Sequence, residues 1–296
     1  MKAGISSISL VYQLKIKALI ELLKLRLSLL VTFSSAFGYL LGNAGKLDWE
    51  QFMWFCVGGF FITGSSVTIN QILEKKFDRL MKRTVNRPLP TDRITKSEAI
   101  WYSIFLAITG SLILLNFTNI LTLVLAVSSL ILYAFIYTPL KRVGPIAVFV
   151  GAIPGALPPL IGWAAATNMI GHEALIIFGI QFIWQFPHFW AIAWVSDDDY
   201  KRAGFKLLPA GGKKDLNTAI NIMIYTLFLL PLGLLPSYFG LTGITSGVIA
   251  TICGVLFLSQ TFQLMKDNSR KSALKIMFSS FVYLPIVQIA YLVDKI

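Results

Sequence analysis

Long apolar stretches alternate with short polar segments along almost the whole chain. A helix of about 20 apolar residues crosses the hydrocarbon core of a bilayer, and this pattern predicts nine such spans. They lie near 18–42, 51–73, 97–116, 118–138, 143–166, 173–195, 216–238, 241–264 and 273–293. Only Asn116, Thr118 and Asn119 separate the third span from the fourth. The predicted fold class is therefore all-α, a polytopic membrane bundle of nine transmembrane helices.

Composition supports a membrane protein and excludes other classes. Of the 296 residues, 56% are hydrophobic and 14% are charged, with a mean hydropathy of +0.71. Soluble domains carry about 25% charged residues, so this chain lacks the polar surface that water requires. The two cysteines, Cys56 and Cys253, lie inside apolar runs and cannot build a disulfide framework or a zinc cluster.

The placement of basic residues predicts the orientation. Of the 26 Lys and Arg, 24 fall on one set of alternate segments, and only Lys46 and Lys295 fall on the other. Because short loops rich in Lys and Arg stay in the cytoplasm, we expect a cytoplasmic N-terminus in a single domain over 1–296. The loops at about 74–96 and 196–215 are then cytoplasmic too. Topology accounts for the net charge of +12, so no nucleic-acid partner is expected.

Targeting features favour a retained membrane protein. The first span is too long for a signal core and lacks a small-residue cleavage site. The first 20 residues contain no acid and several Ser, a faint likeness to a mitochondrial transit sequence. We therefore expect a bacterial plasma membrane, with the mitochondrial inner membrane as the alternative.

A first polar cluster follows the second span. Asn70, Glu74 and Asp78 are spaced four residues apart, so on a helix they form one stripe roughly 12 Å long. Such oxygens suit Mg²⁺, which usually binds one or two carboxylates together with substrate phosphates, and a diphosphate fits the stripe. We expect the helix to end at Pro88 and Pro90.

Basic side chains follow this stripe and offer partners for the remaining phosphate charge; they are Arg79, Lys82, Arg83 and Arg87. A plainer interpretation remains open at this point. In it, Glu74 and Asp78 pair with Lys75 and Lys82 on a solvated loop.

A second acidic cluster, Asp197, Asp198 and Asp199, follows the sixth span at the same membrane face. Adjacent carboxylates repel and normally need a cation or surrounding bases. One site between the second and sixth helices is therefore expected to gather metal and diphosphate. Since successive helical residues point about 100° apart, at least one of the three is expected to face solvent.

Other segments near this face have several possible roles. His188 lies in an apolar segment, where ionisable side chains usually face a bundle interior or cavity, and ligand contact, proton transfer and a structural role remain open. Lys141 and Arg142 close the fourth span and are interpreted first as topological charges. Gly151 to Pro159 concentrates small residues and helix breakers, which permit close packing or kinks beside a cavity and are interpreted first as architecture.

These motifs resemble the UbiA-type intramembrane prenyltransferase superfamily, and within it the protohaem IX farnesyltransferase branch. The first motif, from Asn70 to Leu89, and the second, from His188 to Pro209, carry the resemblance, together with Tyr137 to Arg142 and the Gly/Pro-rich fifth span. Trp194 and Ser196 depart from the wider superfamily, because they stand where polar metal-binding positions are expected.

The resemblance implies an Mg²⁺-dependent enzyme, with two ions possible, that transfers the farnesyl group of farnesyl diphosphate to the vinyl group of haem B. Water supplies the hydroxyl of the product, haem O, and haem B is a substrate rather than a prosthetic group. A haem A synthase is a possible partner beside the lipid bilayer.

The resemblance also implies roles for individual residues. Metal ligands are Asn70, Glu74, Asp78 and Asp199, with Asp198 beside them in the second acidic site. Diphosphate contacts are Arg83 and Arg87, then Lys201, Arg202 and Lys206. Contacts to the acceptor are His188, Lys141 and Arg142.

Two rival functions follow from the sequence. A quinone-pathway prenyltransferase with an aromatic acceptor has the same expected fold. An ion-coupled transporter is more remote, because transporter sites lie near the bilayer midplane between repeated halves, whereas these acids crowd one end of nine spans.

Overall fold

A computed structural model describes residues 13–296 and is all-helical over that range. Nine helical spans in this part of the chain are long and apolar enough to cross a membrane. They are α2 (Leu25–Gly42), α3 (Trp49–Asp78), α4 (Lys96–Phe117), α5 (Ile120–Ile131) continued through the π-helix η1 (Leu132–Tyr137) and α6 (Thr138–Leu140), α7 (Ile146–Thr167), α8 (His172–Val195), α10 (Leu216–Tyr238), α11 (Ile244–Asp267) and α12 (Arg270–Val293). The short helix α9 (Asp197–Arg202) follows α8. The predicted fold class is confirmed.

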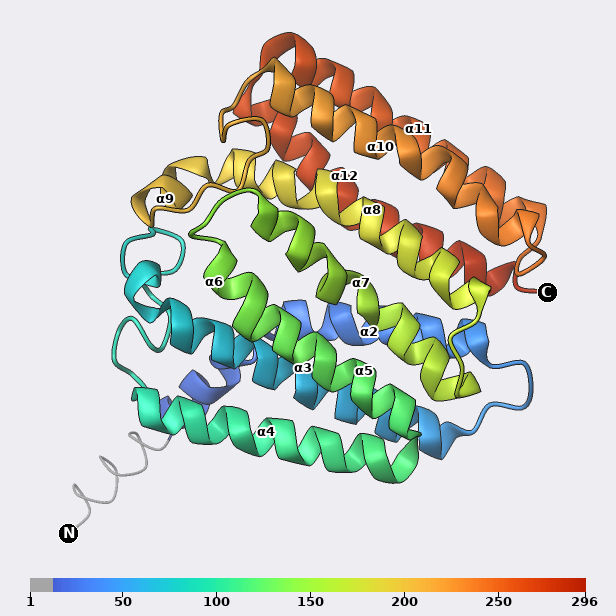
Figure 1. The fold of residues 1–296 in the computed structure, drawn as a ribbon, viewed down its shortest axis with the longest axis horizontal. Coiled ribbons are helices and arrows are strands. Elements are labelled where there is room, and N and C mark those ends of the chain that lie inside the picture. Colours follow the sequence, from blue (N-terminus) through green and yellow to red (C-terminus); the bar gives the residue numbers. More distant parts are fainter. Residues whose placement is uncertain (1–12) are drawn as a thin grey trace.

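The bundle is organised around α7, which is the most buried span and lies between α2, α5 and α8 (Figure 1). Small residues let α2 and α7 approach closely. A Cβ added at Gly38 would lie 1.9 Å from the carbonyl oxygen of Pro159, and one at Gly162 would lie 1.9 Å from that of Ser35. Without a hydrophobic driving force between helices in lipid, such contacts are a main source of helix association.

A polar cluster also ties the central helices together within the bundle. Gln288 of α12 donates hydrogen bonds to Ser34 of α2 (2.9 Å) and to Gln181 of α8 (3.0 Å). Gln181 in turn donates to the carbonyl oxygen of Gly155 in α7 (2.8 Å). The polar groups of these buried side chains therefore have hydrogen-bond partners inside the bundle and are not exposed to lipid.

The break between the third and fourth predicted spans is confirmed, because α4 ends at Phe117 and Asn119 caps the N-terminus of α5 by accepting from the amide of Thr122. The first span differs from the prediction. A helical segment at 13–22 ends before Lys24, which has a left-handed backbone (φ 46°), and α2 begins at Leu25.

The predicted helix end at Pro88 and Pro90 is wrong. The second span ends at Asp78, and residues 79–95, here called the first loop, fold into turns. The hydroxyl of Thr84 donates to the carbonyl oxygen of Asp78 (2.8 Å), which satisfies one of the acceptors left open at a helix C-terminus. Local side-chain contacts thus end the helix before the prolines are reached.

The first loop and α9 lie at the same end of the bundle, while the C-terminus lies at the other (Figure 1). We call this the charged end. Both sequence clusters therefore meet at one end, as the alternation of basic segments predicts.

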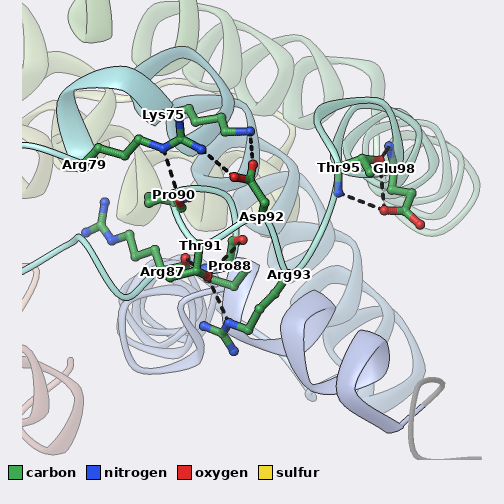
Figure 2. A network of polar contacts seen from close by, with 10 residues as sticks. All are labelled: Lys75, Arg79, Arg87, Pro88, Pro90, Thr91, Asp92, Arg93, Thr95 and Glu98. Carbon is green, nitrogen blue, oxygen red and sulfur yellow. Dashed lines mark hydrogen bonds and ion pairs between the residues drawn. The ribbon is translucent and has the colours of Figure 1, made fainter. Parts of the chain in front are cut away.

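Ion pairs hold the first loop in a defined shape (Figure 2). Lys75 and Arg79 both pair with Asp92, at 2.7 and 2.6 Å, and Arg79 also donates to the carbonyl oxygen of Pro90 (3.0 Å). Arg93 pairs with Glu21 in the helical segment 13–22 (2.6 Å). The hydrogen bond from the Arg93 guanidinium lowers the pKa of the Glu21 carboxyl. This ion pair connects the helical segment 13–22 to the first loop.

Candidate active site

The three oxygen-bearing residues of the first motif lie buried near the end of α3, and each contacts a different basic side chain. The Nζ of Lys24 lies 3.3 Å from Asn70 Oδ1, and the Nζ of Lys141 lies 2.8 Å from Glu74 Oε1. Nη1 of Arg87 lies 2.9 Å from both oxygens of Asp78, which is fully buried. We call these six side chains the polar row; they are Asn70, Glu74, Asp78, Lys24, Lys141 and Arg87.

The three cations of the polar row come from three different parts of the chain. Lys24 precedes α2, Lys141 follows α6, and Arg87 belongs to the first loop. Only folding brings them to α3. The plainer interpretation of the sequence paired Glu74 and Asp78 with Lys75 and Lys82, but those carboxylates contact Lys141 and Arg87 instead.

The polar row holds three basic groups and two carboxylates, so it has a net positive charge whenever Lys24 is protonated. Burial lowers the pKa of Lys141, but the charge and hydrogen bond of Glu74 outweigh burial and raise it overall. Lys24 contacts only the neutral amide of Asn70. Burial, and then the charge of Arg87, lower the pKa of Lys24 to about 7. An anion bound at the row would favour the protonated form of Lys24, so the row is suited to an anion.

Hydrogen bonds fix the orientation of the Asn70 amide. Its Nδ2 donates to Thr138 Oγ1 (3.0 Å), and Thr138 donates onward to the carbonyl oxygen of Tyr133 (2.9 Å). The amide oxygen is therefore directed to Lys24. A pocket of about 80 Å³ opens beside this chain of contacts. Its lining residues are Leu73, Glu74, Phe77, Thr138, Pro139, Arg142 and Phe205.

In the second acidic cluster, the three aspartates have three different environments. Asp199 accepts from the backbone amides of Lys82 (3.1 Å) and Arg83 (3.2 Å) in the first loop. The side chain of Asp198 is 85% exposed, and that of Asp197 is 8% exposed. The expectation that at least one of them faces solvent is thus met by Asp198.

The basic residues after the second cluster mostly pair with its acids. Lys201 and Lys214 pair with Asp197 at 2.7 and 3.2 Å. Arg202 pairs with Asp199 at 3.0 Å. Lys206 lines a small pocket beside Asp197. In this arrangement Asp199 links the two loops of the charged end.

Two further arginines lie against aromatic rings at the charged end. The guanidinium of Arg83 lies 5.6 Å from the ring centre of Tyr200, and that of Arg142 lies 5.2 Å from the ring centre of Phe77. Cations at such distances from a ring are attracted by its negative face. Arg142 thereby borders the pocket next to Glu74.

His188 lies buried between α8 and α12. Its Nδ1 is 2.8 Å from Ser280 Oγ, and Ser280 itself donates to the carbonyl oxygen of Met277 (2.6 Å). Since a hydroxyl has one proton to donate, Nδ1 of His188 carries the proton of this contact. The ring also stacks on Trp184 at 4.4 Å. These contacts favour the structural role of the three that the sequence left open.

The side-chain oxygens of Asn70, Glu74 and Asp78 fit Mg²⁺ only when a bound ligand supplies further oxygen atoms. Among residues 13–296, no three His, Cys, Asp or Glu side chains are grouped closely enough to hold a metal ion on their own. One amide and two carboxylate oxygens on α3 match the usual Mg²⁺ arrangement, in which phosphates and water complete the octahedron.

The sequence does not predict the contacts of three residues at the charged end. Lys24 carried a signal, as a basic residue inside a leucine-rich stretch. Thr138 lies in the segment from Tyr137 to Arg142, but nothing in that pattern indicates that its hydroxyl accepts from the Asn70 amide. Asp197 belongs to the predicted acidic cluster, but spacing alone does not tell that its side chain is buried whereas that of Asp198 faces solvent.

Residues 30–283 match the UbiA prenyltransferase family. The protohaem IX farnesyltransferase of Cytophaga hutchinsonii is 54% identical over 95% of this chain and 98% of its own length. That of Flavobacterium psychrophilum is 43% identical over 93% of each.

A solved structure of a UbiA homologue from Archaeoglobus fulgidus, bound to GPP and Mg²⁺, superposes with a TM-score of 0.66 at 15% identity. It covers 93% of this chain and 99% of that chain, and at this identity it shows that the two chains share a fold. The length and level of the sequence matches go further: the chain belongs to the UbiA prenyltransferase family, and within it to the protohaem IX farnesyltransferases.

Proposed function

We propose that this protein transfers the farnesyl group of farnesyl diphosphate to the vinyl group of haem B, with addition of water, and so forms haem O. The observation that carries the proposal is the polar row at the charged end of the membrane bundle. There, each of three buried oxygen-bearing side chains on α3 contacts one basic side chain from another segment. The names of the relatives support the choice of acceptor.

The polar row suits the departure of diphosphate from an allylic carbon. Negative charge grows on the leaving group as the C–O bond breaks, and buried basic groups stabilise that charge more strongly than water does. Glu74 and Asp78 place Lys141 and Arg87 at the site before the substrate arrives, so both cations are already close to the position of the leaving group.

Asn70, Glu74 and Asp78 are proposed to hold Mg²⁺ with the diphosphate, and Asp199 is proposed to complete the site from the second loop. When bound, the ion supplies a Lewis acid that neutralises phosphate charge. The solved homologue with GPP and Mg²⁺ supports this part of the proposal. The contacts of Asp199 with the amides of Lys82 and Arg83 bring its carboxylate to the first loop.

After the diphosphate leaves, the allylic carbocation must meet the vinyl carbon before it meets water. The bond to the vinyl carbon moves the positive charge onto the acceptor, and water then adds there with loss of a proton. An apolar bundle interior keeps water from the first cation, and aromatic faces stabilise it. The aromatic group formed by Phe186 and Trp190 of α8 and Tyr225 of α10, with 4.4–5.4 Å between ring centres, is proposed as such an environment.

We further propose that the charged end faces the cytoplasm of a bacterial plasma membrane. The excess of Lys and Arg at this end supports that orientation. Haem propionates are anionic, and the basic groups left beside the pocket, above all Arg142, suit them. A haem A synthase that takes up haem O is a fitting downstream partner.

The test offers purified protein farnesyl diphosphate and Mg²⁺ with haem B, and in parallel with 4-hydroxybenzoate or a naphthoate. Mass spectrometry is expected to detect haem O and no prenylated aromatic acid. Preferential prenylation of either aromatic acid would assign the chain to the quinone-pathway alternative instead.

A further inference from the structure

Lys24 occupies an unusual place in the backbone, at the junction of the helical segment 13–22 and α2. It has φ 46° and ψ 56°, a left-handed conformation that non-glycine residues seldom adopt. Such conformations persist only where surrounding contacts enforce them.

The contacts that enforce this junction are specific. Gln71 of α3 donates to the carbonyl oxygen of Leu22 (2.7 Å), and Ser28 donates to that of Leu23 (2.6 Å). Both leucines are buried. The junction is thereby fixed to α3 one residue after Asn70, and the break in the helix lets the Lys24 side chain reach the polar row.

Among the three cations of the polar row, Lys24 is bound most weakly. Lys141 and Arg87 contact carboxylates at 2.8 and 2.9 Å, whereas Lys24 contacts a neutral amide oxygen at 3.3 Å. A hydrogen bond to a charged group is worth more than one to a neutral group. Lys24 is therefore the cation most readily released to a stronger acceptor.

Lys24 also shares its acceptor with the metal that the proposed function places there. A divalent ion and an ammonium on the same amide oxygen repel each other at close range. When the ion approaches Asn70 Oδ1, the ammonium has to move, and a diphosphate oxygen at the same site is a better partner than the amide it leaves.

We propose that Lys24 is a diphosphate-binding residue that holds the amide oxygen of Asn70 in the free enzyme and turns to a phosphate oxygen when a divalent ion takes its place. This inference rests on the proposed function, because it requires diphosphate and a divalent ion at the polar row. It adds Lys24, at the junction between the segment 13–22 and α2, to the residues proposed to bind the diphosphate.

The experiment measures binding rather than turnover, with Mn²⁺ and inorganic pyrophosphate as probes. Full-length protein in lipid nanodiscs is titrated with Mn²⁺ alone and with pyrophosphate at saturating Mn²⁺, and free Mn²⁺ is followed by electron paramagnetic resonance. Lys24→Met is compared with wild type, with the charge-retaining Lys24→Arg, and with Lys17→Met. Lys17 is exposed on the segment 13–22, so its variant removes the same charge away from the polar row.

Lys24→Met is expected to weaken pyrophosphate binding roughly 10- to 100-fold, the range for losing a hydrogen bond to a charged group. It should bind Mn²⁺ alone at least as tightly as wild type, because the competing ammonium is gone. Lys24→Arg should retain most pyrophosphate binding, and Lys17→Met should match wild type.

The outcomes separate the two hypotheses. Loss of both Mn²⁺ and pyrophosphate binding in Lys24→Met would assign Lys24 a purely structural role and overturn the inference. So would pyrophosphate binding equal to that of wild type. If wild type itself binds no pyrophosphate with Mn²⁺, the proposed function fails first.

Discussion

The pair formed by Asp78 and Arg87 allows the energetics of the site to be tested apart from catalysis. Asp78 is fully buried, and Arg87 is its partner at 2.9 Å, with its own side chain 22% exposed. Arg87→Met leaves the carboxylate buried without that partner. Breaking a buried pair in this way costs about 3–5 kcal/mol. The charge of Lys24 also interacts with Asp78, so we expect a loss near the lower end of that range.

Asp78→Asn should cost less, about 1–2 kcal/mol, because Arg87 is partly exposed and can turn towards water. In the double variant neither charge is left unpaired, since a neutral amide replaces the carboxylate and a neutral thioether replaces the guanidinium. We therefore expect the double variant to be more stable than Arg87→Met, with a coupling free energy of roughly 2 kcal/mol.

The assay is reversible unfolding by SDS in mixed micelles, followed by far-UV circular dichroism for the wild type, both single variants and the double variant. Turnover should stay abolished in the double variant even though part of the free energy of unfolding is recovered. The reason is that the Asp78 carboxylate and the Arg87 guanidinium are both proposed to bind Mg²⁺ and diphosphate. Additive free energies of unfolding, with no coupling between the two positions, would refute the view that Asp78 and Arg87 form a buried ion pair.

Three further outcomes follow from the same structure. Gly38→Ala should lower the free energy of unfolding by about 1–3 kcal/mol, since its new methyl group meets the backbone of α7, whereas Gly59→Ala, with open space around it, should change stability little; the same SDS titration compares them. Asp199→Asn should speed proteolysis of the first loop and lower turnover several-fold, because it weakens the contacts with the loop amides, and Asp198→Asn should have the smaller effect on both. Removal of divalent ions with EDTA should abolish haem O formation, and added Mn²⁺ should restore it; full activity in EDTA would remove the metal from the proposal.

The spans could be predicted from sequence because bilayer thickness imposes a minimum length on each apolar helix. Even the weak break at Asn116 to Asn119 is confirmed, since Asn119 is a good N-cap residue. The stripe of Asn70, Glu74 and Asp78 was also predictable, because helical periodicity alone places the three on one face.

The partners of that stripe were not predictable in the same way. Lys24 lies in a run of leucines that favours an unbroken helix, and only contacts from α3 and α2 enforce its left-handed backbone. The donors that join the two loops are backbone amides of Lys82 and Arg83, which have no signature in a sequence. Likewise, the end of α3 depends on Thr84 and Arg87 contacting Asp78 after folding, so the prolines gave the wrong boundary.

The central claim is that the oxygens of Asn70, Glu74 and Asp78 hold a diphosphate through a divalent ion. A crystal structure with Mn²⁺ and a non-hydrolysable thio-analogue of farnesyl diphosphate tests it directly, because anomalous scattering locates the ion independently of the protein atoms. The account predicts a Mn²⁺ peak within coordination distance of these side chains and of the phosphate oxygens. An ion and head group bound elsewhere, with the α3 oxygens still paired to Lys24, Lys141 and Arg87, would contradict it.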